Sequence, residues 1–236
     1  MDNFSSNSEH RQIVDNAALN KFLSKMYGIM TLAVFVSAFT AYLTMTVFAG
    51  PMIRLASHSW SLWILLLLPF ALTIGISFRA TRNPVASFIM LMITAIIYGI
   101  TFALIAGAYT GADIAAAFLS SAAVFITMAV IGTVTKKNLS NLGSYASAAL
   151  IGLIVAWIIN MFLRNPMVDY VFSFIAVIIF TILTAWDAQQ MKKIYLQYGN
   201  EVSTTGLAVQ GALMLYLDFI NLFLQFLEIF GFSDRN

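Results

Sequence analysis

Long apolar segments dominate this sequence and decide the solvent in which the chain folds. Each segment reaches the roughly 20 mainly apolar residues that an α-helix needs to cross a bilayer. Only 9% of the residues are charged, whereas a soluble domain carries about 25%. Six such segments occupy residues 26–48, 60–78, 85–106, 114–134, 143–163 and 168–186. The sequence therefore predicts an all-α membrane protein.

A seventh apolar segment, at residues 207–230, carries the four polar side chains of Asp218, Asn221, Gln225 and Glu228. Its length and its many Leu and Phe residues favour a seventh transmembrane helix. The alternative is a protein of six spans whose last segment lies on the membrane or re-enters it, which would leave the C-terminus inside. We predict seven transmembrane helices.

The chain shows no internal boundary after its polar start. Turn-forming pairs such as Gly50-Pro51 and Asn83-Pro84 join the apolar segments through short connections. Without a linker or a convincing internal repeat, the inverted-repeat architecture of many transporters has no support. We predict a polar, largely disordered cytoplasmic tail at residues 1–22 and a single seven-helix membrane domain at residues 23–236.

The positions of Lys and Arg predict the orientation, because cytoplasmic loops are enriched in these residues. With seven spans and a cytoplasmic N-terminus, nine of the twelve fall inside and three outside. The inside group is Arg11, Lys21, Lys25, Arg79, Arg82, Lys136, Lys137, Lys192 and Lys193, and the outside group is Arg54, Arg164 and Arg235. This alternation predicts that the C-terminus lies outside.

Composition excludes several classes of function. The sequence has no cysteine, so disulfides, thiolate catalysis and cysteine-ligated metals are absent. The net charge of +2 is too small to indicate binding to nucleic acid. His10 and His58 lie far apart and are interpreted as surface residues. We predict no resident cofactor and the lipid bilayer as the main partner.

Asp218 is the most unusual residue of the seventh segment. It lies about twelve residues, or roughly 18 Å, into the segment, where a charged group costs a few kcal/mol and normally faces other helices. Asn221, Gln225 and Glu228 lie within about 80° of it on a helix and form a polar stripe. The stripe is either part of a polar pore or a hydrogen-bonded packing seam.

Asp187 is ambiguous on physical grounds. It lies at the predicted cytoplasmic end of the sixth segment, where it either snorkels to the interface, pairs with Lys192 and Lys193, or serves a function. Arg79 ends the second segment on the same side and is close enough in depth to pair with it. Asn160 of the fifth segment is a weaker candidate and is interpreted as a packing residue.

Two motifs near the C-terminus are distinctive. They are Ala-Trp-Asp-Ala-Gln-Gln-Met-Lys at residues 185–192 and Gly-Ala-Leu-Met-Leu-Tyr-Leu-Asp-Phe-Ile-Asn-Leu-Phe at residues 211–223. Both resemble motifs of the Bax inhibitor-1 family. Met-Tyr-Gly-Ile-Met-Thr at residues 26–31 and Lys-Lys-Asn-Leu-Ser at residues 136–140 resemble bacterial members. The similarity covers nearly the whole chain after the tail, so we expect a protein of the bacterial inner membrane.

The resemblance implies a fold and a set of site residues. It implies that the last helix is central and surrounded by the other six, and that two aspartates in the sixth and seventh helices share a proton. These match Asp187 and Asp218. It also implies that an arginine ending the second helix latches the closed state, for which Arg79 is a better match than Arg82. The acidic residue usual in the second helix has no counterpart between Ser61 and Phe78.

The resulting prediction is a pH-sensitive calcium leak channel rather than an enzyme. Two neighbouring carboxylates cannot both ionise cheaply, so they share a proton. In one state Asp187, Asp218 and Arg79 are bonded and the central helix closes the path. In the other, a change in protonation frees carboxylate oxygens, which calcium prefers as ligands and to which it would bind weakly.

The depths of the two aspartates conflict with direct contact. From the helical rise alone, Asp187 lies about 10 Å shallower than Asp218. Contact between them requires the sixth helix to continue past the membrane edge, or the seventh to begin later than residue 207.

Other functions remain open. An intramembrane aspartyl protease also needs two aspartates, but the sequence around Asp218 has neither Gly-x-Gly-Asp nor a following Pro-Ala-Leu. The lack of an internal repeat weakens the case for a coupled transporter. The main alternative is a regulatory or scaffold protein that binds other membrane proteins, such as a membrane protease, because the family is linked to cell-death suppression and to control of membrane proteolysis.

Overall fold

The computed structural model describes residues 16–51, 59–199 and 201–233, which form seven long α-helices and contain no strand. The helices are α1 (Asn16–Thr46), α3 (Ser59–Arg79), α4 (Pro84–Ala106), α5 (Gly111–Val134), α6 (Ser140–Leu163), α7 (Pro166–Tyr198) and α8 (Thr204–Ser233). Most bounds lie within a few residues of the predicted segments, so the all-α class is confirmed.

The surface of the bundle is suited to lipid. Among the described residues, six helices are long and apolar enough to cross a membrane, namely α1 and α4 to α8, and α3 contributes a shorter apolar stretch at Leu67–Arg79. Large apolar side chains point outward, as at Phe78 and Phe162, which are 78% and 77% exposed. So many exposed apolar side chains are not found on soluble monomers. The protein is therefore a multi-pass membrane protein.

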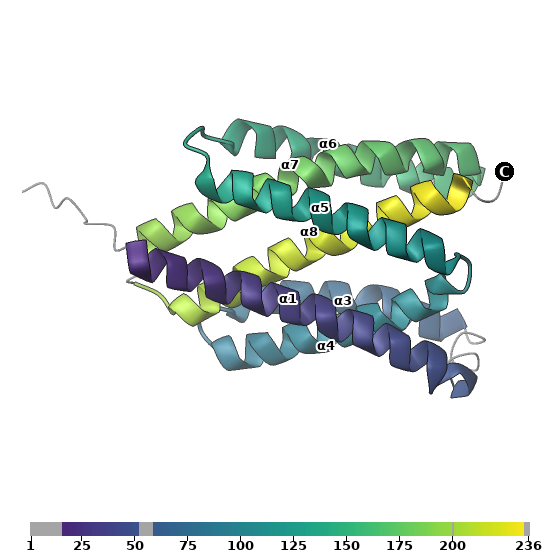
Figure 1. Cartoon of the computed structure of the whole chain (residues 1–236), viewed down its shortest axis with the longest axis horizontal. Helices are drawn as coiled ribbons and strands as arrows, with labels where there is room; N and C mark the ends of the chain where they lie inside the picture. The colour runs from purple at the N-terminus through teal and green to yellow at the C-terminus, as the bar shows by residue number, and fades with distance from the viewer. Residues whose placement is uncertain (1–15, 52–58, 200, 234–236) are drawn as a thin grey trace, which may run out of the picture.

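α8 passes through the middle of the bundle. In Figure 1 it runs diagonally, with α1, α3 and α4 on one side and α5, α6 and α7 on the other. It contacts α1, α3, α4, α5 and α7, whereas α6 packs mainly on α7, so the last helix is central but five helices, not the predicted six, pack closely around it. Ala208, Ala212, Leu215 and Leu222 of α8 have no exposed surface. This position suits a helix with polar side chains, because lipid tails offer no hydrogen-bond partners.

Small residues let the outer helices approach α7 closely. A Cβ on Gly132 of α5 would overlap the backbone carbonyl of Ala185, and a Cβ on Gly143 of α6 would overlap the ring of Trp186. Such crossings are typical of membrane helices, which associate through close van der Waals contact. The two contacts hold α7 immediately before Asp187.

α1 begins earlier than predicted. Its first residue is Asn16, so residues 16–22 of the predicted tail are helical, and Leu19 and Phe22 are buried. Polar residues break the apolar run before residue 26, but the apolar residues still recur on one helix face, so the short helix that leads into the first span is continuous with it. Residues 1–15 of the predicted tail lie outside the described residues.

α7 ends later than predicted. It continues to Tyr198, twelve residues past the predicted end at 186. The ring of Tyr195 stacks on that of Phe22, with ring centroids 4.3 Å apart. The extension of α7 and the early start of α1 therefore pack against each other through these rings.

Candidate functional site

Asp187 of α7 and Asp218 of α8 meet inside the bundle. Their carboxyl groups are joined by a side-chain hydrogen bond, and the residues are only 7% and 5% exposed. Such a bond requires a proton on one carboxyl, since an ionised carboxylate only accepts. Among the described residues, Oδ1 of Asp187 and Oδ2 of Asp218 have no hydrogen-bond partner. The two carboxyls thus form a buried pair in which one oxygen of each group is left without a donor.

The length of α7 removes the conflict in depth. Asp187 lies eleven residues before the end of α7 at Tyr198, and Asp218 lies fourteen residues after the start of α8 at Thr204. A short turn joins these two ends, so both distances run from the same end of the bundle. They correspond to about 16 Å and 21 Å of helix. The difference of about 5 Å is small enough for crossing helices to bring the carboxyls together.

The two lysines that follow Asp187 bind elsewhere. Nζ of Lys192 donates to the backbone carbonyl of Thr133 at 2.7 Å, and Nζ of Lys193 donates to Oδ1 of Asn138 at 2.7 Å. Asp187 is buried rather than directed to the interface. Asp187 therefore neither snorkels to the membrane interface nor pairs with these lysines in this structure.

Gln189 anchors this part of α7, and sequence reasoning assigned it no role. Its side chain accepts from the backbone N–H of Leu139 at 2.9 Å and donates to the carbonyl of Lys137 at 2.7 Å. These bonds fasten α7 to the turn between α5 and α6. The sequence does contain a polar residue two positions after Asp187, which could have suggested an anchor. Gln190, the next residue, is equally polar, so the sequence alone does not show which of the two makes these bonds.

Arg79 does not contact the pair in this structure. Its side chain is exposed at the end of α3, and the described residues contain no ion pair between it and either aspartate. The next residue, Ala80, packs against Gly206 near the start of α8, about 18 Å of helix away from Asp218. Arg82 is exposed in the turn that leads to α4. The predicted latch between Arg79 and the two aspartates is not formed in this structure. It stays a prediction, which would require a different conformation.

The other polar residues of α8 separate into two groups. Nδ2 of Asn221 donates to the carbonyl of Leu217 at 2.8 Å, within its own helix. Gln225 and Glu228 instead line a cavity of 310 Å³ near the far end of α8. That cavity begins about two helical turns beyond Asp218 and is distinct from the carboxyl pair.

Asn160 of α6 belongs to the turn between α6 and α7. Its Nδ2 donates to Oδ1 of Asp169 at 2.6 Å and to the carbonyl of Asn165 at 3.0 Å. These are local bonds that hold the turn, and Asn160 does not reach α8 through them. Asp169, however, lines the same cavity as Gln225.

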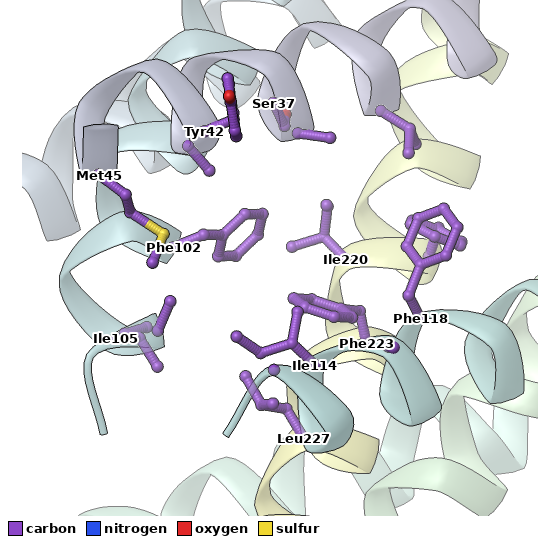
Figure 2. Close-up of a pocket in the computed structure, with 17 residues that line it drawn as sticks. Ser37, Tyr42, Met45, Phe102, Ile105, Ile114, Phe118, Ile220, Phe223 and Leu227 are labelled. Carbon is purple, nitrogen blue, oxygen red and sulfur yellow. The ribbon is translucent and has the colours of Figure 1, made fainter. Parts of the chain in front are cut away.

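A larger pocket, of 480 Å³, lies among α1, α4, α5 and α8. Figure 2 shows Met45 and Phe102 directed into it, and no charged side chain lines it. Its α8 residues Ile220 and Leu227 lie roughly opposite Asp218 around the helix. The pocket suits hydrocarbon and offers no ligands to an ion.

The described residues contain no group of three or more His, Asp or Glu that could hold a metal ion. Two carboxyls offer few ligands to a hard cation, so Asp187 and Asp218 would bind one only weakly, and a proton held between them would have to leave first.

Comparisons with known proteins place these observations in context. The family described as Bax1-I, inhibitor of apoptosis-promoting Bax1, matches residues 19–235. An uncharacterized membrane protein of Streptococcus pyogenes serotype M3 is 39% identical over 93% of this chain and 96% of its own length. The inner membrane protein YbhL of Escherichia coli K12 is 34% identical over 91% of this chain and 93% of its own length. An uncharacterized protein of Rickettsia prowazekii is 31% identical over 90% of each chain. None of these three names describes an enzyme.

Proposed function

Because this chain belongs to the Bax inhibitor-1 family, we propose that it is a pH-sensitive cation leak channel in which Asp187 and Asp218 form the proton switch. The observation that carries the proposal is the hydrogen bond between two buried carboxyls, one on α7 and one on the central helix α8. A structural seam needs no ionisable group, whereas a switch does. Calcium is the expected ion, because it prefers carboxylate oxygens.

The shared proton holds the two helices together in this scheme. When the proton leaves, two negative charges face each other in a poorly solvated site, and their repulsion favours separation of α7 from α8. A cation that reaches the ionised carboxyls relieves the repulsion. Cation occupancy of the pair therefore rises as the proton is lost, that is, with increasing pH.

α8 is the element that such a switch would move. It contacts five other helices, so a small displacement at Asp218 changes the packing along the whole bundle. Arg79 has a place in this cycle as the predicted latch, which forms if the end of α3 and the pair approach each other in a second conformation. A seven-span topology, with α3 as the second span, puts the N-terminus inside and the C-terminus outside.

Calcium flux into liposomes tests the proposal. The purified protein is reconstituted with a calcium dye inside, and flux is recorded over a range of pH for the wild type, Asp187→Asn and Asp218→Asn. We expect a pH-dependent flux that becomes independent of pH in both variants. Asp113→Asn is the matched control, because Asp113 is a buried carboxylate that caps α5 and lies outside the pair.

Two results would overturn this function. If neither variant differs from the wild type in its pH dependence, the carboxyl pair is not the sensor. If the wild-type protein moves no cation at any pH, the leak itself is wrong. Repeating the assay with Na⁺, K⁺ and Mg²⁺ determines whether the leak is selective for calcium.

A second candidate function follows from the description of the family as an inhibitor of another protein. Under this second function, the chain binds and regulates another membrane protein. The carboxyl pair determines which conformation of this chain binds the partner. A protein that is silent in liposomes but captured with one partner from the inner membrane, in a manner altered by Asp218→Asn, would favour this function.

A further inference from the structure

A polar cavity lies at the end of the bundle opposite the turn that joins α7 to α8. It occupies 310 Å³ between the start of α7, the last third of α8 and Tyr109 of the turn between α4 and α5. Its polar lining consists of Asp169, Ser173, Gln225, Glu228 and Tyr109. No Lys or Arg is among the lining residues. The cavity therefore has two acidic groups and no basic side chain to neutralise them.

Gln225 is the observation that points to a ligand. Its side chain is 9% exposed and lines the cavity, and among the described residues neither its amide oxygen nor its amide nitrogen has a hydrogen-bond partner. Although most of the side chain is buried, these two amide atoms are not among the fully enclosed atoms without a partner, so they face the open space of the cavity. Gln225 lies about 20° from Asp218 around α8, two turns further along, so it cannot bond to the carboxyl pair itself.

Both carboxylates of the cavity keep one oxygen available. Oδ1 of Asp169 accepts from Asn160 at 2.6 Å, and Oε2 of Glu228 accepts from the hydroxyl of Tyr109 at 2.6 Å. Within the described residues, no donor is bonded to the second oxygen of either group. The donors orient the two carboxylates without neutralising them.

The packing of Tyr109 shows that this arrangement is built into the helices. Its ring lies against Gly231 of α8, where a Cβ would overlap it. The glycine therefore allows the hydroxyl to reach Glu228, one turn earlier on the same helix. Arg164 precedes α7 by two residues, but its side chain is exposed and does not line the cavity.

We propose that this cavity is a weak binding site for a hard divalent cation such as Ca²⁺, with Asp169, Glu228 and Gln225 as its protein ligands. Two carboxylates and an amide oxygen are ligands that calcium prefers. The volume is far above the roughly 30 Å³ that one water occupies, so the cation keeps part of its hydration shell. Few ligands and retained waters give an affinity of about 0.1–1 mM, the range of weak extracellular sites.

The position of the site gives it a role in the proposed leak. Asp169 lies in the first turn of α7 and Glu228 near the end of α8, so a hydrated cation reaches them without crossing the apolar layer. Under the predicted orientation this is the outer end. The site would concentrate cations about 10 Å of helix away from Asp218. The inference extends the proposed leak, but binding at this cavity does not depend on conduction.

Equilibrium binding of Ca²⁺ to the full-length protein in detergent tests the inference. The wild type is expected to show a saturable site that does not require the Asp187 and Asp218 pair, and Glu228→Gln and Asp169→Asn should each weaken it by about tenfold or more, because affinity follows the number of ligand charges. Asp113→Asn removes a carboxylate from the same end of the bundle but outside the cavity, so it should bind as the wild type does. The variant with both Asp187→Asn and Asp218→Asn should also bind normally.

The outcomes separate this inference from the proposed leak. Binding that survives Glu228→Gln and Asp169→Asn, or that disappears when only the Asp187 and Asp218 pair is changed, would overturn the outer site. A protein that binds Ca²⁺ through Glu228 but conducts no ion would retain the site and refute the leak.

A second measurement uses Trp157, which lines the cavity. Tb³⁺ is a hard cation that emits when a nearby indole transfers energy to it. Emission excited through tryptophan should appear on titration, decline as Ca²⁺ competes, and fall in Trp157→Phe while the affinity for Ca²⁺ is kept. Equal emission from Trp157→Phe and the wild type would place the bound ion elsewhere and overturn the assignment.

Discussion

Asp187 and Asp218 lie at nearly the same depth because α7 continues for eleven residues beyond Asp187, to Tyr198. The pair is thus a product of helix length as well as of helix packing. Gly132 and Gly143 hold α7 just before Asp187, and Gln189 holds it just after. These contacts hold α7 on both sides of Asp187 and keep the two carboxyls close together. The proposed loss of one proton therefore acts directly on the contact between them.

The stability of the wild-type protein should fall as pH rises. Under the proposed switch, the folded state holds a proton between Asp187 and Asp218, whereas both carboxyls are ionised in the unfolded chain at neutral pH. Folding then binds one proton, and stability declines by at most about 1.4 kcal/mol per pH unit over the range in which the folded pair holds the proton and the unfolded chain does not. In Asp218→Asn the amide N–H replaces the shared proton, so this slope should vanish.

Thermal unfolding followed by intrinsic tryptophan fluorescence measures this slope, since the chain has four Trp and no Cys for thiol-reactive dyes. Asp113→Asn should keep the wild-type dependence. A wild-type Tm that is flat between mildly acidic and mildly alkaline pH would show that no proton is held at the pair.

Gly132→Ala should destabilise the bundle. The added methyl overlaps the Ala185 carbonyl, and overpacking of this kind costs about 1–3 kcal/mol. Gly152→Ala is the control, because no atom lies within 4 Å of a Cβ at Gly152 and helical Gly→Ala gains up to about 1 kcal/mol. Denaturation of the two variants in the same detergent compares them, and equal stabilities would contradict the close crossing.

Gln189→Ala should cost about 1–3 kcal/mol, because it leaves the backbone groups of Lys137 and Leu139 without their partner. It should also alter the pH dependence of flux, since the end of α7 is released. Gln190→Ala serves as the comparison, because Gln190 is half-buried and has no side-chain hydrogen bond among the described residues. If the two alanine variants behave alike, the role of Gln189 as an anchor is wrong.

Arg79→Gln should leave the free energy of unfolding within about 0.5 kcal/mol of the wild type, since the side chain is exposed and unpaired with the aspartates here. If Arg79 latches a closed conformation, the same variant should raise the leak. Arg82→Gln should change neither quantity. An equal rise in leak from both variants would indicate a general effect of positive charge at this end, not a latch.

Single cysteines test the orientation, since each becomes the only thiol in the chain. Lys136→Cys lies in the turn between α5 and α6, and Met167→Cys lies at the start of α7. Both positions are exposed and occupy opposite ends of α6. A membrane-impermeant maleimide added to spheroplasts should label Met167→Cys alone. Labelling of Lys136→Cys alone would reverse the predicted topology.

Much of the fold was determined by the sequence alone. Apolar runs long enough to cross a bilayer located the helices. In lipid, the backbone N–H and C=O groups find hydrogen-bond partners only within a helix, so the whole run must be helical. Asn83 and Asn165, each followed by Pro, marked helix starts that the structure confirms as side-chain caps. The cost of placing a carboxyl in hydrocarbon singled out Asp218, and the resemblance to a family paired it with Asp187.

The sequence could not decide the contacts that depend on how the helices are arranged. Hydropathy stopped α7 at residue 186, since Lys192 and Lys193 end the apolar run, and only the packing of Tyr195 on Phe22 shows that the helix continues. The partners of Gln189 lie about fifty positions away, and Asp169 and Glu228 line one cavity only because α7 and α8 come together there. The local pattern of apolar and polar residues indicates which face of a helix is buried and whether the helix lies in lipid or in water. The angles and offsets between helices arise from side-chain packing. These angles and offsets decide which polar groups meet.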